Sequence, residues 1–128
     1  MNDSRKSVLV VDDAGLVRLY YRKLLEDAGF RVEEALNGIE ALEKLAAFGA
    51  DLLIVDVNMP QMDGFTFLAT LRAQAGPQAS IPALVTSTEA GEADFRAARA
   101  AGANYYLVKP VDRDSLLEVT AMLCGVAR

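Results

Sequence analysis

The sequence VLVVDD at residues 8–13 is an apolar run that ends in two adjacent acids. Similar apolar runs follow at 52–55, 81–85 and 105–108, and longer stretches with the apolar spacing of a helix separate them. Strands that are apolar at every position are typical of parallel sheets covered by helices on both faces. The alternation of such strands with helices therefore predicts an α/β fold built on a parallel sheet.

The edge of this sheet and the buried faces of its helices can also be predicted. Residues 30–33 (FRVE) alternate apolar and polar side chains, which favours a fifth strand at the margin of the sheet. In the first helix the spacing predicts a buried stripe of Leu16, Tyr20, Leu24 and Ala28, with Val17, Tyr21 and Leu25 beside it. Helix ends are expected at cap and glycine residues, namely Asn37 with Glu40, Asp63, Asp112, Gly49, Gly102 and Gly125.

The size of the chain indicates one domain. It has 128 residues, of which 52% are hydrophobic, and a chain of this size buries about two-thirds of the surface that its unfolded form exposes. We therefore expect a single domain over residues 1–128. Cys124 is the only cysteine and cannot form an internal disulfide, which fits a reducing compartment. No signal peptide or long apolar run is present, so we expect a cytoplasmic protein that does not enter a membrane.

Composition also excludes several classes of function. The net charge is -5 and the lysines and arginines form no cluster, which argues against direct binding of nucleic acid. The chain contains no histidine, so histidine-based catalytic triads, histidine zinc sites and histidine general bases are excluded.

Chemically active side chains follow the expected strands. Asp12 and Asp13 follow the first strand, Asp56 the third, Ser87 the fourth and Lys109 the fifth. Because the carboxyl ends of parallel strands meet at one edge of the sheet, we expect these residues to converge there. Neighbouring carboxylates repel by about 4 kcal/mol per pair at about 4 Å and an effective dielectric of about 20, so a cation must lie among them. Oxygen ligands without histidine or thiolate favour Mg²⁺, and this combination is suited to phosphoryl transfer.

These residues, in this order and at these strand ends, resemble the receiver domain of two-component response regulators. The resemblance rests on Asp12-Asp13, on residues 56–60 (DVNMP) with Asp63-Gly64, on Ser87 and on Lys109-Pro110, and it spans nearly the whole chain. It implies the flavodoxin-like (βα)5 fold, a doubly wound parallel sheet with strand order 2-1-3-4-5. It also implies a cis peptide bond between Lys109 and Pro110.

The resemblance assigns a chemical role to each matching acid. Asp56 would be the nucleophile that takes a phosphoryl group from the phosphohistidine of a kinase. Asp13, Asp56 and the backbone carbonyl of Asn58 would bind Mg²⁺, and Asp12 would act on the metal largely through a water. The protein would then be a phosphoacceptor that catalyses only its own phosphorylation and dephosphorylation.

A switch is implied by three further matches. Ser87 would hydrogen-bond one phosphoryl oxygen, and Lys109 would pair with another. Tyr106 would be the aromatic residue that turns inward on activation, changing the surface made by the fourth helix, fifth strand and fifth helix. Phosphorylation would therefore change the affinity for a partner that binds this surface.

Five positions can be compared with the common pattern of the family. Ser87 stands where threonine is more usual but keeps the hydroxyl, and Val111 stands where phenylalanine often follows Lys-Pro. Thr88 is larger than the residue often found there, so it could narrow access to the phosphoryl group. Asn58 and Glu89 form the pair seen in short-lived chemotaxis-type regulators.

Two other functions compete with this interpretation. A pseudo-receiver would bind partners without being phosphorylated, but such domains usually lack an acid or the lysine, and this chain has all of them. A small Mg²⁺-dependent phosphotransferase of the haloacid dehalogenase type would need Asp-x-Asp after its first strand and a cap domain, and neither is found.

The expected partners follow from the leading interpretation. The phosphoryl donor would be a sensor histidine kinase or a histidine phosphotransfer protein, and the downstream target is a protein that the sequence does not identify. We expect no effector domain, because the chain ends soon after its fifth predicted helix, and a monomer or weak dimer.

Overall fold

The architecture is a five-stranded sheet between two layers of helices. The structure is a computed structural model that describes residues 4–128. The strands are β1 (Ser7–Val11), β2 (Arg31–Ala35), β3 (Leu52–Asp56), β4 (Ala83–Ser87) and β5 (Tyr105–Val108). Every pair is parallel and the order is β2-β1-β3-β4-β5. The predicted parallel sheet, its strand order and the marginal position of the alternating strand are therefore confirmed.

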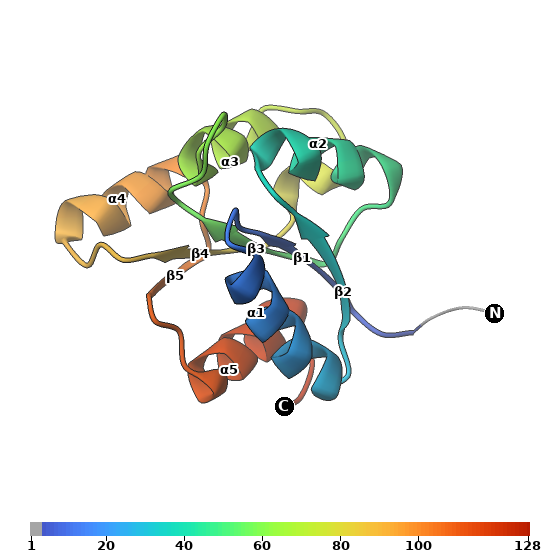
Figure 1. The fold of residues 1–128 in the computed structure, drawn as a ribbon. Coiled ribbons are helices and arrows are strands. Elements are labelled where there is room, and N and C mark those ends of the chain that lie inside the picture. The colour runs from blue at the N-terminus through green and yellow to red at the C-terminus, as the bar shows by residue number, and fades with distance from the viewer. Residues whose placement is uncertain (1–3) are drawn as a thin grey trace.

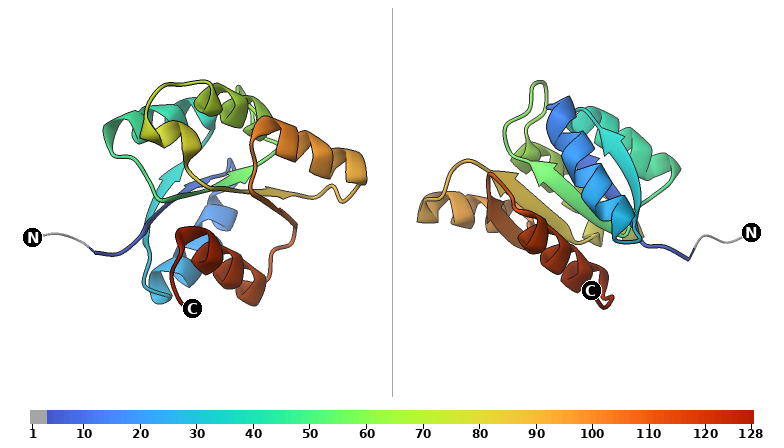
Figure 2. Two further views of the ribbon diagram at one scale, coloured as in Figure 1. Left: turned by 180° about the vertical axis from the view of Figure 1, so that it is seen from behind. Right: turned by 60° about the horizontal axis from the view of Figure 1, so that its bottom comes forward.

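Helices cover both faces of the sheet. They are α1 (Gly15–Asp27), α2 (Gly38–Ala47), α3 (Gly64–Arg72), α4 (Glu92–Ala101) and α5 (Arg113–Cys124), with a short 3-10 helix at Pro77–Ser80. α1 and α5 lie on one face, and α2, α3 and α4 on the other (Figures 1 and 2). None of the helices within residues 4–128 is long and apolar enough to span a bilayer.

The core consists of two apolar clusters separated by the sheet. Every residue of β1, β3 and β4 is buried. Alternate side chains of these strands point to opposite faces, so Val8, Val10 and Ile54 pack with α1 and α5 whereas Leu9, Val11 and Val55 pack with α2 and α3. The apolar runs of the sequence thus supply both clusters.

The buried face of α1 differs from the predicted one. Tyr21 and Leu25 are the buried residues of this helix, whereas Leu16 is 83% and Tyr20 is 43% exposed. The stripe expected to lie beside the buried face is therefore its centre. Of the stripe expected at the centre, Leu24 packs against the core, whereas Leu16, Tyr20 and Ala28 are exposed. Both stripes are apolar, so the helical period alone could not decide between them; the way α1 packs against β1 and α5 does.

The burial of one strand and the ends of two others differ from the prediction. The apolar run at 105–108 predicts a strand buried like the others. Tyr105 and Val108 are exposed, because β5 is the second edge of the sheet and pairs only with β4. Asp56 and Ser87 are the last residues of β3 and β4 rather than the residues that follow them. Both therefore have the fixed backbone of a strand.

The predicted helix caps are largely present. The side chains of Asn37, Asp63 and Asp112 accept hydrogen bonds from backbone N–H groups of the first turns of α2, α3 and α5. Gly102 and Gly125 end α4 and α5 in the left-handed region. These caps fix where the helices begin and end beside the strand ends.

Candidate functional site

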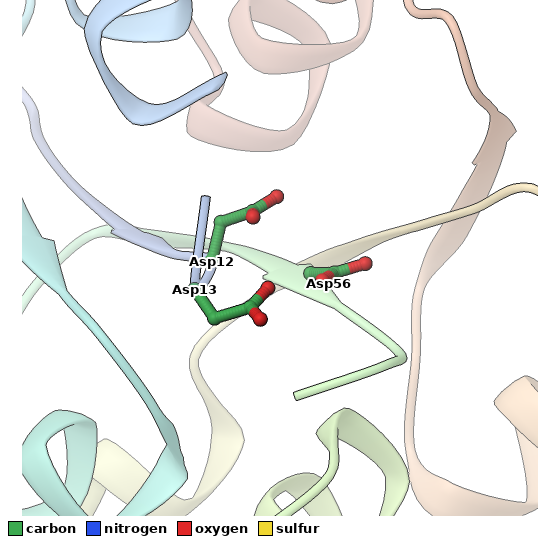
Figure 3. A group of neighbouring side chains, drawn as sticks. All are labelled: Asp12, Asp13 and Asp56. Atoms are coloured by element: carbon green, nitrogen blue, oxygen red, sulfur yellow. The ribbon is translucent and has the colours of Figure 1, made fainter. Parts of the chain in front are cut away.

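The acids converge at the carboxyl edge of the sheet. β1 and β3 are neighbours in a register that pairs Val11 with Val55, so the next residues, Asp12 and Asp56, lie side by side. Both are almost completely buried, at 1% and 5% exposure, and Asp13 is exposed. One carboxylate oxygen of each of the three acids lies within 4.8 Å of the others. Figure 3 shows the three side chains gathered at the ends of the two strands.

Lys109 brings a positive charge to these acids. Its Nζ lies 3.0 Å from Asp56 Oδ1 and 3.1 Å from Asp12 Oδ2. The position of Lys109 is set by the end of β5, because its backbone N–H donates to the Ser87 carbonyl oxygen at 2.7 Å. The peptide bond that follows, to Pro110, is cis. Three carboxylates against one ammonium leave two negative charges when all are ionised.

Burial governs the electrostatics of the site. Burial raises the pKa of Asp56, and the charge of Asp12 raises it further, although the hydrogen bond from Lys109 opposes both. Burial alone would lower the pKa of Lys109, but its hydrogen bonds to Asp56 and Asp12 and their charges outweigh that effect and raise it. Lys109 therefore stays protonated. The ionised form of Asp56 is disfavoured, and it would be stabilised by a proton or by a further cation.

The segment after β3 stays close to Asp56. The backbone N–H of Asn58 faces the Asp56 carboxylate and acts to lower its pKa, and Asn58 itself is exposed. α3 begins close beneath, because Gly64 donates from its N–H to the Val57 carbonyl at 2.9 Å. A Cβ on Gly64 would lie only 2.4 Å from the Asp56 carbonyl oxygen. Glycine is therefore required where α3 approaches the end of β3.

Ser87 and Tyr106 are joined through one residue of the loop between β4 and α4. Ser87 is buried at the end of β4 and its Oγ accepts from the Glu89 N–H at 3.1 Å. The hydroxyl of Tyr106 donates to the Glu89 carbonyl at 2.8 Å. The Tyr106 ring packs edge to face on Phe95 of α4, with ring centroids 4.8 Å apart. A movement of the Ser87 hydroxyl would therefore alter the position of Glu89, and with it the hydrogen bond of Tyr106.

The positions that depart from the common pattern border the site. Thr88 is exposed at its rim, whereas Val111 is buried at 6% exposure. Thr88, Lys109 and Val111 line a mostly apolar hollow of about 340 Å³ against α1. The Tyr20 hydroxyl borders the same hollow and donates to the Val111 carbonyl at 3.1 Å. Lys109 therefore borders this hollow on the α1 side, while its Nζ contacts Asp12 and Asp56.

Two residues near the acids were missed by sequence reasoning. Gly64 was assigned only turn and cap chemistry, although the Asp-Gly pair was a signal that a close backbone approach could follow. Arg18 was not singled out, yet its Nη1 donates to the Asp12 carbonyl oxygen at 2.7 Å. Nothing in the sequence pattern indicates this contact, because it depends on how α1 packs beside the end of β1.

The cluster of acids is compatible with a magnesium site. Three carboxylates with oxygen atoms this close, and with one lysine as the only cation at hydrogen-bond distance among the described residues, supply the hard oxygen donors that Mg²⁺ prefers. The two uncompensated negative charges match a divalent cation. The donor set therefore fits Mg²⁺, and a buried carboxylate with Lys109 beside it can receive an electrophilic phosphorus atom.

Comparison with known proteins gives one consistent result. The family model described as "Response regulator receiver domain" matches residues 8–121. An uncharacterized 14.6 kDa protein of Leptolyngbya boryana is 38% identical over 121 residues, covering 94% of this chain and 92% of that protein. A protein-glutamate methylesterase/protein-glutamine glutaminase of Rhodospirillum rubrum is 38% identical over 126 residues, which is 89% of this chain but only 33% of that protein.

A solved structure agrees with the sequence relatives. The chemotaxis protein CheY4 of Vibrio cholerae is 37% identical to this chain and superposes on it with a TM-score of 0.88, covering 94% of this chain and 99% of that one.

Proposed function

Because this chain belongs to the response regulator receiver domain family of two-component signalling, we propose that it is a switch activated by phosphorylation of Asp56. Domains of this type are generally regulators rather than enzymes acting on other substrates. The observation that carries the proposal is the position of Asp56, buried between Asp12 and Lys109 and within reach of Asp13.

The phosphoryl group would come from the phosphohistidine of a sensor kinase or of a histidine phosphotransfer protein. A carboxylate oxygen of Asp56 attacks phosphorus, the bond from phosphorus to the histidine nitrogen breaks, and an acyl phosphate remains on Asp56. Lys109 would pair with the charge that this group adds, and the Ser87 hydroxyl would donate to a phosphoryl oxygen.

Mg²⁺ would be held by Asp13, Asp56 and the Asn58 carbonyl, with Asp12 acting through a water. When bound, the ion neutralises charge on the transferring phosphoryl group. The buried Asp12 and Asp56 would give the site its negative charge. The exposed Asp13 would face the solvent from which the ion enters.

The output would arise on the face made by α4, β5 and α5. If the Ser87 hydroxyl moves toward the phosphoryl group, it releases the Glu89 N–H that it now accepts from. The hydrogen bond from Tyr106 to the Glu89 carbonyl then shifts as well. Phe95 and Tyr105 are exposed beside Tyr106, around a hollow of about 400 Å³. A change there would alter the affinity of this face for a protein target.

Incubation with acetyl phosphate and Mg²⁺, followed by intact-mass measurement, tests the proposal. We expect the protein to gain one phosphoryl group, Asp56→Asn to gain none, and EDTA to prevent the reaction. Asp27→Asn, which changes an exposed acid at the end of α1, is the matched control and should react like the parent. No labelling of the parent by acetyl phosphate or by phosphorylated kinases would instead indicate a pseudo-receiver.

A further inference from the structure

Arg18 connects the loop that carries two of the acids to α1 and to the edge strand β2. Its Nη1 donates to the Asp12 carbonyl oxygen at 2.7 Å, and its Nε donates to Glu34 Oε1 at 2.8 Å. The side chain is only 15% exposed. The Asp12 carbonyl belongs to the peptide group that joins Asp12 to Asp13. Its hydrogen bond therefore fixes the plane of the peptide between two acids of the cluster.

Glu34 is itself held in place from several sides. Its other carboxylate oxygen, Oε2, accepts from Arg22 Nη1 at 2.6 Å, and its backbone carbonyl accepts from Lys44. Burial would raise the pKa of Glu34, but the hydrogen bonds and charges of Arg22 and Arg18 outweigh it and lower that pKa. Glu34 is therefore ionised and fixed in place, and its carboxylate is the acceptor that holds the guanidinium of Arg18.

Helix energetics alone would not place an arginine here. Arg18 is in the first turn of α1, whose positive dipole end disfavours a cation, and that turn contains no acidic residue. Ala14, at the N-cap, also provides no side-chain hydrogen bond. The position of Arg18 is accounted for by its two contacts outside the helix, with the Asp12 carbonyl and with Glu34.

We propose that Arg18 is a positioning residue that sets the backbone between Asp12 and Asp13 so that both carboxylates face Asp56. The inference rests on the proposed function, because the geometry that it sets is that of the magnesium site. Besides Arg18, the loop is held by the Asp12 N–H, which donates to the Ala35 carbonyl, and by the Ala14 N–H, which donates to Asp12 Oδ1. Neither of these bonds fixes the Asp12 carbonyl.

The sign of one measurement separates positioning from simple charge. A guanidinium close to the acids repels a divalent cation, so its removal should tighten Mg²⁺ binding if charge is all that matters. Removal should weaken binding if Arg18 holds the ligands in place. Arg22 provides the matched control, because it carries the same charge and contacts the same Glu34 but has no hydrogen bond to Asp12.

The test is a calorimetric Mg²⁺ titration of Arg18→Met and Arg22→Met, which both keep an apolar stem. We expect Arg18→Met to bind about tenfold more weakly, the low end of what loss of a ligand-orienting partner costs, and Arg22→Met to bind as tightly as the parent or more tightly. Arg18→Lys, which keeps the charge but not the planar fork, should fall between parent and Arg18→Met. Binding by Arg18→Met at parental strength or tighter would overturn the proposal, as would equal weakening in both methionine variants.

Amide hydrogen exchange in the metal-free proteins gives a second readout that needs no Mg²⁺. The Ala14 amide should exchange faster in Arg18→Met than in Arg22→Met, while amides at the centre of β3 remain unchanged. If the parent binds no Mg²⁺, the proposed function fails and this exchange alone decides on Arg18: equal rates at Ala14 refute its positioning role. If Arg18→Met does not fold, Arg18→Lys decides, and parental Mg²⁺ affinity in that variant refutes the role.

Discussion

Replacing Lys109 by methionine should reveal how strongly the two buried acids depend on one ammonium. Lys109 Nζ is 3.0 Å from Asp56 and 3.1 Å from Asp12, and each contact corresponds to about 5 kcal/mol of attraction at an effective dielectric of about 20. Much of this is offset by desolvation, and removal of one partner from a buried ion pair costs about 3–5 kcal/mol. Because Asp56 can take up a proton in response, we expect the free energy of unfolding to fall by about 3 kcal/mol.

The assay is urea unfolding followed by circular dichroism at neutral pH, with EDTA and then with saturating Mg²⁺. We expect Mg²⁺ to restore part of the loss in Lys109→Met, because the ion supplies positive charge to the same acids. Arg96→Met is the control with the same change in net charge, since the Arg96 side chain is 69% exposed and lies 3.8 Å from Glu92. Such surface pairs contribute at most about 1 kcal/mol. Equal stability losses in the two variants would refute the electrostatic account of the site.

Three further outcomes can be checked on the same protein. Asp13→Ala should weaken Mg²⁺ binding about tenfold or more with little change in urea midpoint, because Asp13 is an exposed acid of the cluster; an unchanged calorimetric titration would exclude it as a ligand. Asp56→Asn should stabilise the metal-free protein, and the gain should grow as the pH rises from about 4.5 to about 7, because a carboxyl whose folded-state pKa is raised costs stability once it ionises. A constant difference across this range in urea titrations would show that Asp56 is not strained by burial. Gly64→Ala should lower the free energy of unfolding by about 1–3 kcal/mol, since its Cβ would meet the Asp56 carbonyl at 2.4 Å, whereas Gly15→Ala, with 3.6 Å to Arg18, should be tolerated.

The fold could be predicted where burial dictates the pattern. β1, β3 and β4 are covered on both faces, so each contains an apolar run, at residues 8–11, 52–55 and 83–85. These runs, together with the helical stretches between them, predict the parallel sheet. The strand order came from the family resemblance, because apolar runs do not specify which strands are neighbours. α1 shows the same limit. Its two apolar stripes are equivalent in sequence, and only the packing of the helix against the sheet determines that Tyr21 and Leu25 are the buried residues.

The candidate site could be located for a related reason. Asp12, Asp56 and Lys109 are at strand ends, and parallel strands bring their carboxyl ends together whatever their separation in the chain. Contacts that depend on how a helix packs against the sheet could not be predicted from the sequence. The bond from Arg18 to the Asp12 carbonyl requires the rotation of α1 about its axis, and the close approach of Gly64 to Asp56 requires the exact path of the segment before α3.

Chemical mapping of the phosphorylated residue tests the central claim most directly. An acyl phosphate on aspartate is reduced by borohydride to homoserine, which peptide mass spectrometry can place in the sequence. After reaction with a phosphorylated donor and Mg²⁺, we predict that homoserine appears at position 56 and at neither Asp12 nor Asp13. Homoserine at one of those two acids, or a phosphorylated protein with aspartate intact at position 56, would contradict the account.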